Sequence, residues 1–324
     1  MLRKLRAERR AQDVLRQLEH VADHGPSHPP ASLLLPAPPR RSPLYELQEW
    51  SHVKSTFTPQ AYMDAVRRAR EYIFAGDVYQ VNLSQRLEAP LRRHPWEIYA
   101  ILRLHNPADF SAFLHCGDTV LASCSPERFL HLNESNVETR PIKGTIARGT
   151  NTVTDQRQLE LLQTSLKDRA ENLMIVDLLR NDLGRVCEIG SVHVPELWAV
   201  EQHPTVYHLV STIRGRLKDG LTPLDLLQAC FPGGSITGAP KIRAMEIIAE
   251  LEPTARGAYC GAIGYVGWNG QMDTNIIIRT LVVRQGRVTW QVGGGVVADS
   301  TPEGEYTETL LKARALSEAV LQTW

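Results

Sequence analysis

Two pairs of acidic residues stand at helical spacing in this sequence. Asp168 and Glu171 are three residues apart in one predicted helix, and Glu305 and Glu308 are three apart in another. Residues at that spacing share one face of a helix. Carboxylate oxygens and waters are the ligands that a hard cation such as Mg²⁺ prefers, so two such faces together could hold this ion. Each pair alone also fits a solvated or salt-bridged helix face, and Lys312 follows Glu308 as an ordinary i,i+4 ion-pair partner.

A glycine-rich segment that ends in a basic residue predicts an anion site. Residues 231–241 read FPGGSITGAPK, and a helix is expected to begin after Pro240. Backbone amides at a helix N-terminus, followed by Lys241, suit an anion. The spacing differs from that of a nucleotide-binding P-loop, so a small carboxylate fits better than a triphosphate. An ordinary tight turn before a helix is the alternative.

Glycine and arginine near the C-terminus suggest a second contact with an anion. Residues 293–295 are three consecutive glycines, and close approach of the backbone to a ligand would explain them. Arg279 follows the apolar run 276–278. Its guanidinium requires an anionic partner if it points inward and none if it points outward.

The apolar patterns predict the elements that position these residues. Helices are expected at 59–75, 95–105, in two stretches within 155–184, after 222, after 240 and at 302–321. Strands are expected at 78–84, 110–115, 119–124, 128–132, 205–217, 257–267, 273–284 and 287–293, with a turn at 140–145. Leu173, Val176, Leu179 and Leu183 are expected to form one buried helix face. Hairpins separated by long helices indicate an α+β fold with mostly antiparallel sheet.

Composition excludes several classes of function. The chain has 324 residues, 43% of them hydrophobic, and its 36 basic and 36 acidic residues cancel. A soluble globular protein is expected, without a charge that attracts nucleic acid or membrane. The five scattered cysteines form no metal-binding pattern and indicate reduced thiols and a cytoplasmic location. No membrane span or signal peptide is predicted.

The first 57 residues differ from the rest. Residues 1–20 are Arg-rich and amphipathic, and residues 20–42 are rich in proline, a composition that does not build a core. We expect an N-terminal arm over residues 1–57, and an ordered catalytic domain over residues 58–324 that begins near Thr58.

From Thr58 onward the motifs resemble those of the chorismate-utilising enzymes. They are GDVYQ (76–80), SPERF (125–129), PIKGT (141–145), DRAEN (168–172), VDLLRND (176–182), HLVS (208–211), residues 231–241 and residues 293–312. The resemblance implies a two-sheet, mostly antiparallel α/β sandwich of the anthranilate synthase component I type. The active site would lie between the sheets.

The resemblance also implies roles for the acids. Glu171 and Glu308 would bind Mg²⁺ directly, and Asp168 and Glu305 would act through waters. The metal would hold the ring carboxylate of chorismate. The enolpyruvyl carboxylate would be held by Arg279, Tyr259, Lys312 and the backbone near Gly293 and Gly295. Ser235 and His208 would lie against the ring.

Position 143 distinguishes branches of this family. Lys143 stands where anthranilate synthases carry alanine. In the branch that makes 4-amino-4-deoxychorismate, the precursor of 4-aminobenzoate for folate synthesis, this lysine would attack C2 of chorismate and expel the C4 hydroxyl, and ammonia would then enter at C4. A lysine amine with its ordinary pKa of about 10.4 is too protonated to attack. A nearby cation such as Lys241 would lower that pKa. Glu127 would be the acid that protonates the leaving hydroxyl.

Gln80 separates amination from hydration. Isochorismate and salicylate synthases carry there a lysine that activates water, and glutamine cannot act as that base. The ammonia-using branch is therefore favoured. The sequence contains no glutaminase motif, so a glutamine amidotransferase subunit is the expected ammonia source.

The N-terminus departs from the family. Family members usually carry a longer region before the helix at 59–75, so the sheets here are expected to be incomplete or completed by a partner. Two alternatives stay open: an anthranilate synthase, against which Lys143 argues, and a truncated, weakly active chorismate-binding subunit.

Overall fold

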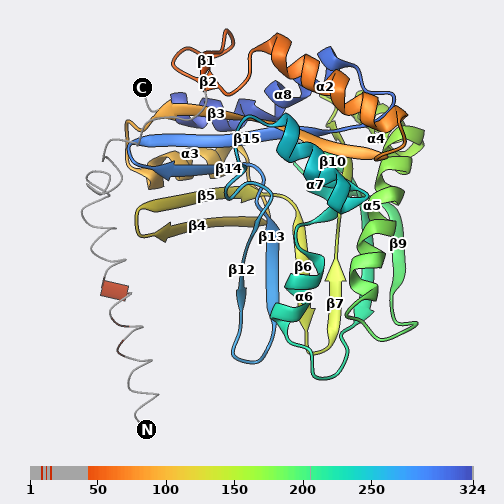
Figure 1. Ribbon diagram of the computed structural model, residues 1–324. Helices are drawn as coiled ribbons and strands as arrows, with labels where there is room; N and C mark the ends of the chain where they lie inside the picture. The colour runs from red at the N-terminus through yellow and green to blue at the C-terminus, as the bar shows by residue number, and fades with distance from the viewer. Residues whose placement is uncertain (1–8, 10–11, 13–14, 17–42, 205, 323–324) are drawn as a thin grey trace.

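The computed structural model describes residues 9, 12, 15–16, 43–204 and 206–322. Two antiparallel sheets form the framework, and in Figure 1 the strands of one run across the view while those of the other run down it. The expected α+β class, with two mostly antiparallel sheets flanked by helices, is confirmed. No helix in these residues is both long and apolar enough to cross a lipid bilayer.

The first sheet carries the glycine-rich strand. Its order is β1 (Tyr45–Glu46), β2 (Lys54–Ser55), β3 (Gln80–Pro90), β15 (Arg287–Val296), β14 (Thr280–Arg284), β5 (Thr119–Ser125) and β4 (Phe110–Cys116), and β11 (Gly238–Ala239) also pairs with β3. Strand β15 pairs with β3 along its whole length but with β14 only from Arg287 to Trp290. The remaining edge of β15, residues 291–296, therefore has no strand neighbour on that side among the described residues.

The second sheet has the order β12 (Ala262–Val266), β13 (Met272–Ile276), β6 (Arg128–Asn133), β7 (Asn136–Thr139), β10 (Val206–Arg216) and β8 (Ile142–Ala147), and β9 (His193–Gln202) also pairs with β10. The expected turn at 140–145 is wrong. Residues 142–147 form β8, because β10 supplies their backbone partners, with Thr145 opposite His208. Strand β9 was not predicted.

Helices cover each sheet with a separate apolar core. Helices α3 (Pro95–His105) and α8 (Pro302–Leu321) pack on the first sheet around the fully buried Trp290. Helices α2 (Pro59–Phe74) and α7 (Lys241–Leu251) pack around Val81 and Leu83 of β3. Helices α5 (Leu166–Gly184) and α6 (Pro223–Cys230) cover the second sheet, and α4 (Thr152–Thr164) packs on β10 through Leu162.

Two predicted features of the packing need correction. Leu173 is 47% exposed, and Ile175 takes its place on the buried face of α5 beside Val176, Leu179 and Leu183. Residues 43–57 do not behave as a loose arm, because β2 pairs with β3 and Val53 is fully buried in the core. The rest of the expected arm, with its amphipathic helix, lies almost wholly outside the described residues.

The chain passes between the two sheets at two points that matter for function. The run 273–284, expected as one strand, divides into β13 of the second sheet and β14 of the first, and Arg279 lies in the connection with a φ of 50°. Likewise β5 ends at Ser125 and β6 begins at Arg128, which leaves Glu127 in the connection. Both charged residues are thus placed where the sheets meet.

Candidate active site

One cavity of ≈ 500 Å³ is lined by every residue to which the family resemblance gave a role in catalysis or in binding substrate or metal. The cavity lies between the free edge of β15, the first turns of α5 and α8, and the two connections between the sheets. These residues therefore lie around one space, which the sequence could not show. These residues are Glu127, Lys143, Asp168, Glu171, His208, Ser235, Tyr259, Arg279, Gly293, Gly295, Glu305, Glu308 and Lys312.

The first turn of α5 carries one acidic pair. The side chain of Ser165 caps this helix by accepting from the backbone N–H of Asp168 at 3.2 Å. Gly144 of β8, with a φ of 87°, lies beside that turn, and a Cβ there would be 3.0 Å from the Cβ of Asp168. Glycine thus lets β8 approach the helix closely. Burial raises the pKa of Glu171, and the charge of Asp168 adds to the rise.

The first turns of α8 carry the other pair. Glu305 is 5% exposed, and its Oε1 accepts from Ser300 Oγ at 2.6 Å, while its buried Oε2 has no partner. A Cβ on Gly294 would lie 2.7 Å from Oε2 of Glu305 and 3.2 Å from Oε1 of Glu308, so glycine leaves room for these carboxylates where they stand.

The four acids match Mg²⁺ in chemistry. They supply carboxylate oxygens from two facing helices, and the orphaned Oε2 of Glu305 is an acceptor that burial leaves without a donor. As their side chains stand, no three acidic, histidine or cysteine residues in the described part of the chain converge into a metal cluster. Lys312, at 2.6 Å from Glu308, and Lys167, at 3.8 Å from Glu171, provide positive charge there.

Lys143 projects into the same cavity from β8. Burial lowers the pKa of its amine, the charge of Glu171 opposes that change, and the charge of Lys312 lowers the pKa further. The expectation that Lys241 lowers the pKa of Lys143 is wrong. Its Nζ lies 2.6 Å from Asp182 Oδ2 and 2.9 Å from the carbonyl of Cys230, and it does not line the cavity. Residues 231–241 therefore contribute Ser235, on the short helix η2 (Gly234–Ile236), rather than an anion seat at α7.

Glu127 has the properties of a general acid. It is 6% exposed, and burial raises the pKa of its carboxyl to about 7, against the lowering effects of the Ser235 hydroxyl and of Lys143. A carboxyl with a pKa near neutrality can hold a proton and donate it to a leaving group. The cavity thus contains an amine with a lowered pKa and an acid with a raised one.

His208 is neutral at physiological pH. Burial lowers the pKa of its ring to about 4, and His203, whose ring centre is 4.9 Å away, lowers it too. Its Nδ1 shares a hydrogen bond of 2.8 Å with the hydroxyl of Thr145 on β8. The ring can therefore pack against a substrate or exchange a hydrogen bond, but it does not supply a charge.

Arg279 and Lys312 form the cationic end of the cavity. Nη1 of Arg279 donates to the backbone carbonyl of Lys312 at 2.7 Å, and Nζ of Lys312 donates to the carbonyl of Gly293 at 2.9 Å. Arg279 points inward. This is the orientation in which its guanidinium requires an anionic partner. Tyr259 also lines the cavity and interacts electrostatically with Arg279.

Sequence reasoning missed Asn82, Thr145, Lys167 and Gln291, which also line the cavity. Asn82 is two residues after Gln80, and the alternation of side chains along a strand would have placed both on one face. Gln291 precedes the glycines by two residues and could have been found in the same way.

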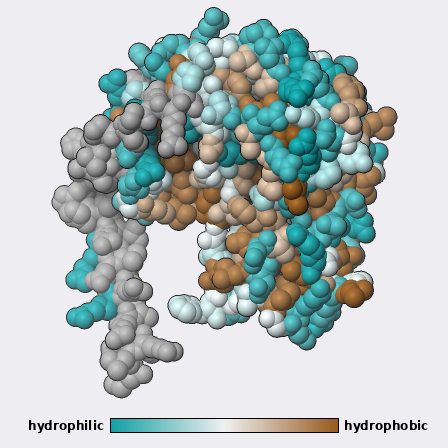
Figure 2. All heavy atoms as spheres, in the orientation of Figure 1, coloured by the Kyte–Doolittle hydropathy of each residue, from teal (hydrophilic) through white to brown (hydrophobic). Residues whose placement is uncertain are grey.

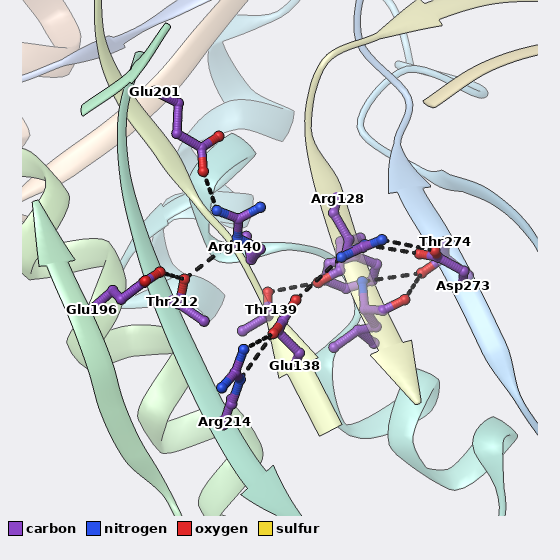
Figure 3. Close-up of polar contacts among 12 residues, drawn as sticks. Arg128, Glu138, Thr139, Arg140, Glu196, Glu201, Thr212, Arg214, Asp273 and Thr274 are labelled. Carbon is purple, nitrogen blue, oxygen red and sulfur yellow. Dashed lines mark hydrogen bonds and ion pairs between the residues drawn. The ribbon is translucent and has the colours of Figure 1, made fainter. Parts of the chain in front are cut away.

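A second cavity of ≈ 570 Å³ lies between β4 and the second sheet, but its two arginines are already paired. Arg128 bonds to Asp273 and Glu138, and Arg140 bonds to Glu201 and Thr212, as Figure 3 shows. In the view of Figure 2, hydrophobic residues gather beside this region below the first sheet. A cavity whose arginines are neutralised is poorly suited to a dianionic substrate.

Comparisons with known proteins identify the family. A model of the chorismate binding enzyme family matches residues 3–318. The chain belongs to this family. Aminodeoxychorismate synthase component 1 of Salmonella typhimurium is 51% identical over 278 residues, which are 86% of this chain and 61% of that protein. Anthranilate synthase component 1 of Thermus thermophilus is 49% identical over 267 residues, 82% of this chain and 58% of that protein.

Solved structures of the chorismate-binding family share the fold. Anthranilate synthase component I from Streptococcus pneumoniae superposes with a TM-score of 0.79 at 36% identity, over 96% of this chain and 65% of that one. A 2,3-dihydroxybenzoate-specific isochorismate synthase from Bacillus anthracis gives 0.74 at 26% identity, over 83% of this chain and 73% of that one. The present chain thus spans about three fifths of the length of the two curated relatives named above.

Proposed function

We propose that this chain binds chorismate and aminates it at C4, as an aminodeoxychorismate synthase component 1. The observation that carries the proposal is the presence of Lys143 and Glu127 in one buried cavity, with the pKa of the amine lowered and that of the acid raised to about 7. Both shifts favour the form that the proposed reaction needs, a neutral amine on Lys143 and a protonated carboxyl on Glu127. The name of the Salmonella relative and the family match support the substrate class.

The two carboxylates of chorismate match the two ends of the cavity. Arg279 and Lys312, together with the backbone beside Gly293 and Gly295, would hold one carboxylate. Mg²⁺, carried by Glu171 and Glu308 with Asp168 and Glu305 through waters, would neutralise and orient the other. Tyr259 would join Arg279 and Lys312 at the first carboxylate, and Ser235 and the neutral ring of His208 would lie against the carbocycle.

The lysine and the acid would then act in two displacements. The Nζ lone pair of Lys143 attacks C2, both ring double bonds shift by one position, and the C4–O bond breaks as Glu127 gives its proton to the departing oxygen, which leaves as water. The proton lost from the alkylated amine returns to Glu127. Ammonia next forms a bond to C4, both double bonds shift back, and the C2–Nζ bond breaks while Glu127 protonates the departing Nζ. The new ammonium group returns a proton to Glu127.

The experiment that tests this proposal omits ammonia. Incubation with chorismate and Mg²⁺ is expected to leave a chorismate-derived mass on the peptide that contains Lys143. Lys143→Met, which has a similar volume and no amine, should form no adduct and should lose most of the C4 amination. A Lys143→Met protein that makes 4-amino-4-deoxychorismate at the wild-type rate would show that the lysine is only a neighbour.

Anthranilate synthesis is the second candidate, because a relative of that activity is 49% identical. It requires ammonia to enter at C2, where Lys143 would compete for the same carbon. Product analysis decides between the two: a 2-amino product from the wild-type chain would favour anthranilate synthase. A third candidate, a chorismate-binding subunit of weak activity, predicts binding of chorismate with little product of either kind.

A glutamine amidotransferase subunit is the proposed source of ammonia. The relatives in question are named as component 1, which implies a second component. We propose that this chain uses free ammonia when alone and receives it from the partner when assembled.

A further inference from the structure

A lysine shares the catalytic cavity with the four acidic residues. Lys167 is the second residue of α5, directly before Asp168, and it lines the cavity. Its Nζ lies 3.8 Å from Oε1 of Glu171, which follows one helical turn later. The same ammonium group interacts electrostatically with Glu305 and Glu308 on α8. Lys167 therefore acts on acids of both helices.

The acids on these two helices carry more charge than their fixed partners neutralise. The charge of Glu308 acts unfavourably on Glu171 across the cavity. Lys312 is held by two bonds, at 2.6 Å to Glu308 and at 2.9 Å to the carbonyl of Gly293. Oε2 of Glu305 is buried and has no hydrogen-bond partner. Carboxylates grouped in this way repel one another, so a further positive charge beside them is stabilising.

The contact of Lys167 with these acids is loose. Its side chain is 57% exposed, whereas that of Glu171 is 17% exposed. The separation of 3.8 Å is longer than a hydrogen bond, and Nζ of Lys167 makes no hydrogen bond within the described part of the chain. A lysine side chain has a flexible four-carbon stem, so this ammonium group can move into water while the backbone of α5 stays in place.

A divalent cation would compete with the ammonium group for the same oxygens. Mg²⁺ binds carboxylate oxygens at about 2.0–2.1 Å and carries twice the charge of an ammonium group. Two cations about 4 Å apart on shared carboxylates repel each other. We propose that Lys167 and Mg²⁺ exclude each other: the ammonium group neutralises these acids when no metal is bound and leaves them when Mg²⁺ binds. The inference rests on the proposed function, since it takes the four acids as the metal site.

Calorimetric titration with Mg²⁺ alone, at low ionic strength and without chorismate, tests this exchange. Lys167→Met removes the charge and keeps most of the length of the side chain. The metal then has no ion pair to displace, so its affinity should rise about three- to tenfold. Lys167→Arg retains a competing cation and should bind Mg²⁺ as the wild type does. Unchanged or weaker binding of Mg²⁺ by Lys167→Met would overturn the proposal.

Arg180→Met is the matched control. Arg180 lies on the same helix and forms an i,i+3 pair with Asp177, in which the two side chains are 50% and 78% exposed. Neither residue lines the cavity. Loss of this positive charge should leave the Mg²⁺ affinity unchanged. An equal gain of affinity in Arg180→Met would show an effect of net charge alone and would remove the specific role of Lys167.

Chemical labelling of amines follows the exchange in the unaltered chain. When Mg²⁺ separates Lys167 from Glu171, the peptide that contains Lys167 should react faster with acetic anhydride. Lys54 is the reference, because it forms an ion pair of 2.7 Å with Glu46 and is 44% exposed. Its rate of labelling should be the same with and without Mg²⁺. A rate at Lys167 that stays the same or falls on addition of Mg²⁺ would contradict the displacement.

The outcomes separate this inference from the proposed function. If the wild-type chain binds Mg²⁺ and aminates chorismate, but Lys167→Met binds Mg²⁺ no more tightly, only the exchange is refuted. If Lys167→Met instead weakens the binding of chorismate and leaves the Mg²⁺ affinity unchanged, the lysine contacts the substrate and the proposal is wrong. If the wild-type chain binds no Mg²⁺, the proposed metal site fails and the exchange fails with it.

Discussion

The amine of Lys312 lies 2.6 Å from Oε1 of Glu308, one helical turn earlier on α8. The same amine donates to the carbonyl of Gly293 at 2.9 Å, so it ties the helix to the free edge of β15. Burial alone would raise the pKa of Glu308, but the ammonium of Lys312 outweighs this effect and lowers the pKa. Glu308 is therefore held as a carboxylate at the cavity, which is the form that a cation requires. The ion pair of Glu308 and Lys312 has the i,i+4 spacing of an ordinary surface pair, but both residues line the cavity.

Glu308→Gln is expected to weaken Mg²⁺ binding by about 100-fold, because the amide keeps the shape but loses the charge of a ligand. Calorimetric titration with Mg²⁺ alone measures this without any reaction, and the C4 amination rate should fall in parallel. Glu303→Gln is the matched control, since Glu303 lies on the same helix with a side chain that is 69% exposed. Glu308→Gln with unchanged Mg²⁺ affinity would remove this residue from the metal site.

Glu127 should control the alkaline side of the pH dependence. The group must be protonated to act as the acid, so formation of the Lys143 adduct should slow as the pH rises through about 7, where its carboxyl titrates. The neutral fraction of Lys143 changes in the opposite direction, so the profile should be bell-shaped. Glu127→Gln should lower the rate and abolish the alkaline decline. An unchanged profile in this variant would assign the proton to another group.

Glu127 also leads to a prediction about stability that does not depend on activity. The carboxyl has a pKa of about 7 in the folded chain instead of 4.5, so the folded state retains a proton that the unfolded state has already lost between those values. Stability should therefore fall as pH rises across this window, by roughly 3 kcal/mol. Glu127→Gln should lose that part of the pH dependence, as measured by urea unfolding at both ends of the window. If the free energy of unfolding changed with pH equally in the wild-type protein and in Glu127→Gln, the burial of the Glu127 carboxyl would be contradicted.

Arg256→Ala should be strongly destabilising. Arg256 bonds to Glu252 and to the carbonyls of Ile236 and Asn82, and its side chain is only 13% exposed. Removal leaves Glu252 buried without its counter-ion, which is expected to lower the free energy of unfolding by about 3–5 kcal/mol. Arg180→Ala is the control, because the pair of Arg180 with Asp177 is exposed and should contribute less than about 0.5 kcal/mol. Denaturant unfolding compares the two variants.

Ammonium salts alone should support turnover, with a rate that rises as the fraction of unprotonated ammonia rises. Glutamine should be inactive as a nitrogen donor until a separate glutamine amidotransferase subunit is added. Detection of the amino product by mass, with each donor in turn, checks both statements. Turnover with glutamine by the isolated chain would refute the proposal that a separate subunit supplies the ammonia.

Features that depend on near neighbours in the chain could be predicted from the sequence. The bounds of α3 match the predicted 95–105, because Pro95 and the apolar spacing are local signals. The shared helix faces of Asp168 with Glu171 and of Glu305 with Glu308 follow from helical geometry alone. The motif resemblance supplied the remaining site residues, and the structure places all of them around one cavity.

The tertiary structure decided what depends on distant partners. Residues 142–147 form a strand because β10 pairs with them, and this pairing presents Lys143 to the cavity. The run 273–284 divides because its halves find partners in different sheets, which places Arg279 in the connection. Lys241 turns to Asp182 because that carboxylate, 59 residues away in sequence, is buried beside it. Local spacing fixes which side chains share a face, whereas strand pairing and buried charge fix which faces meet.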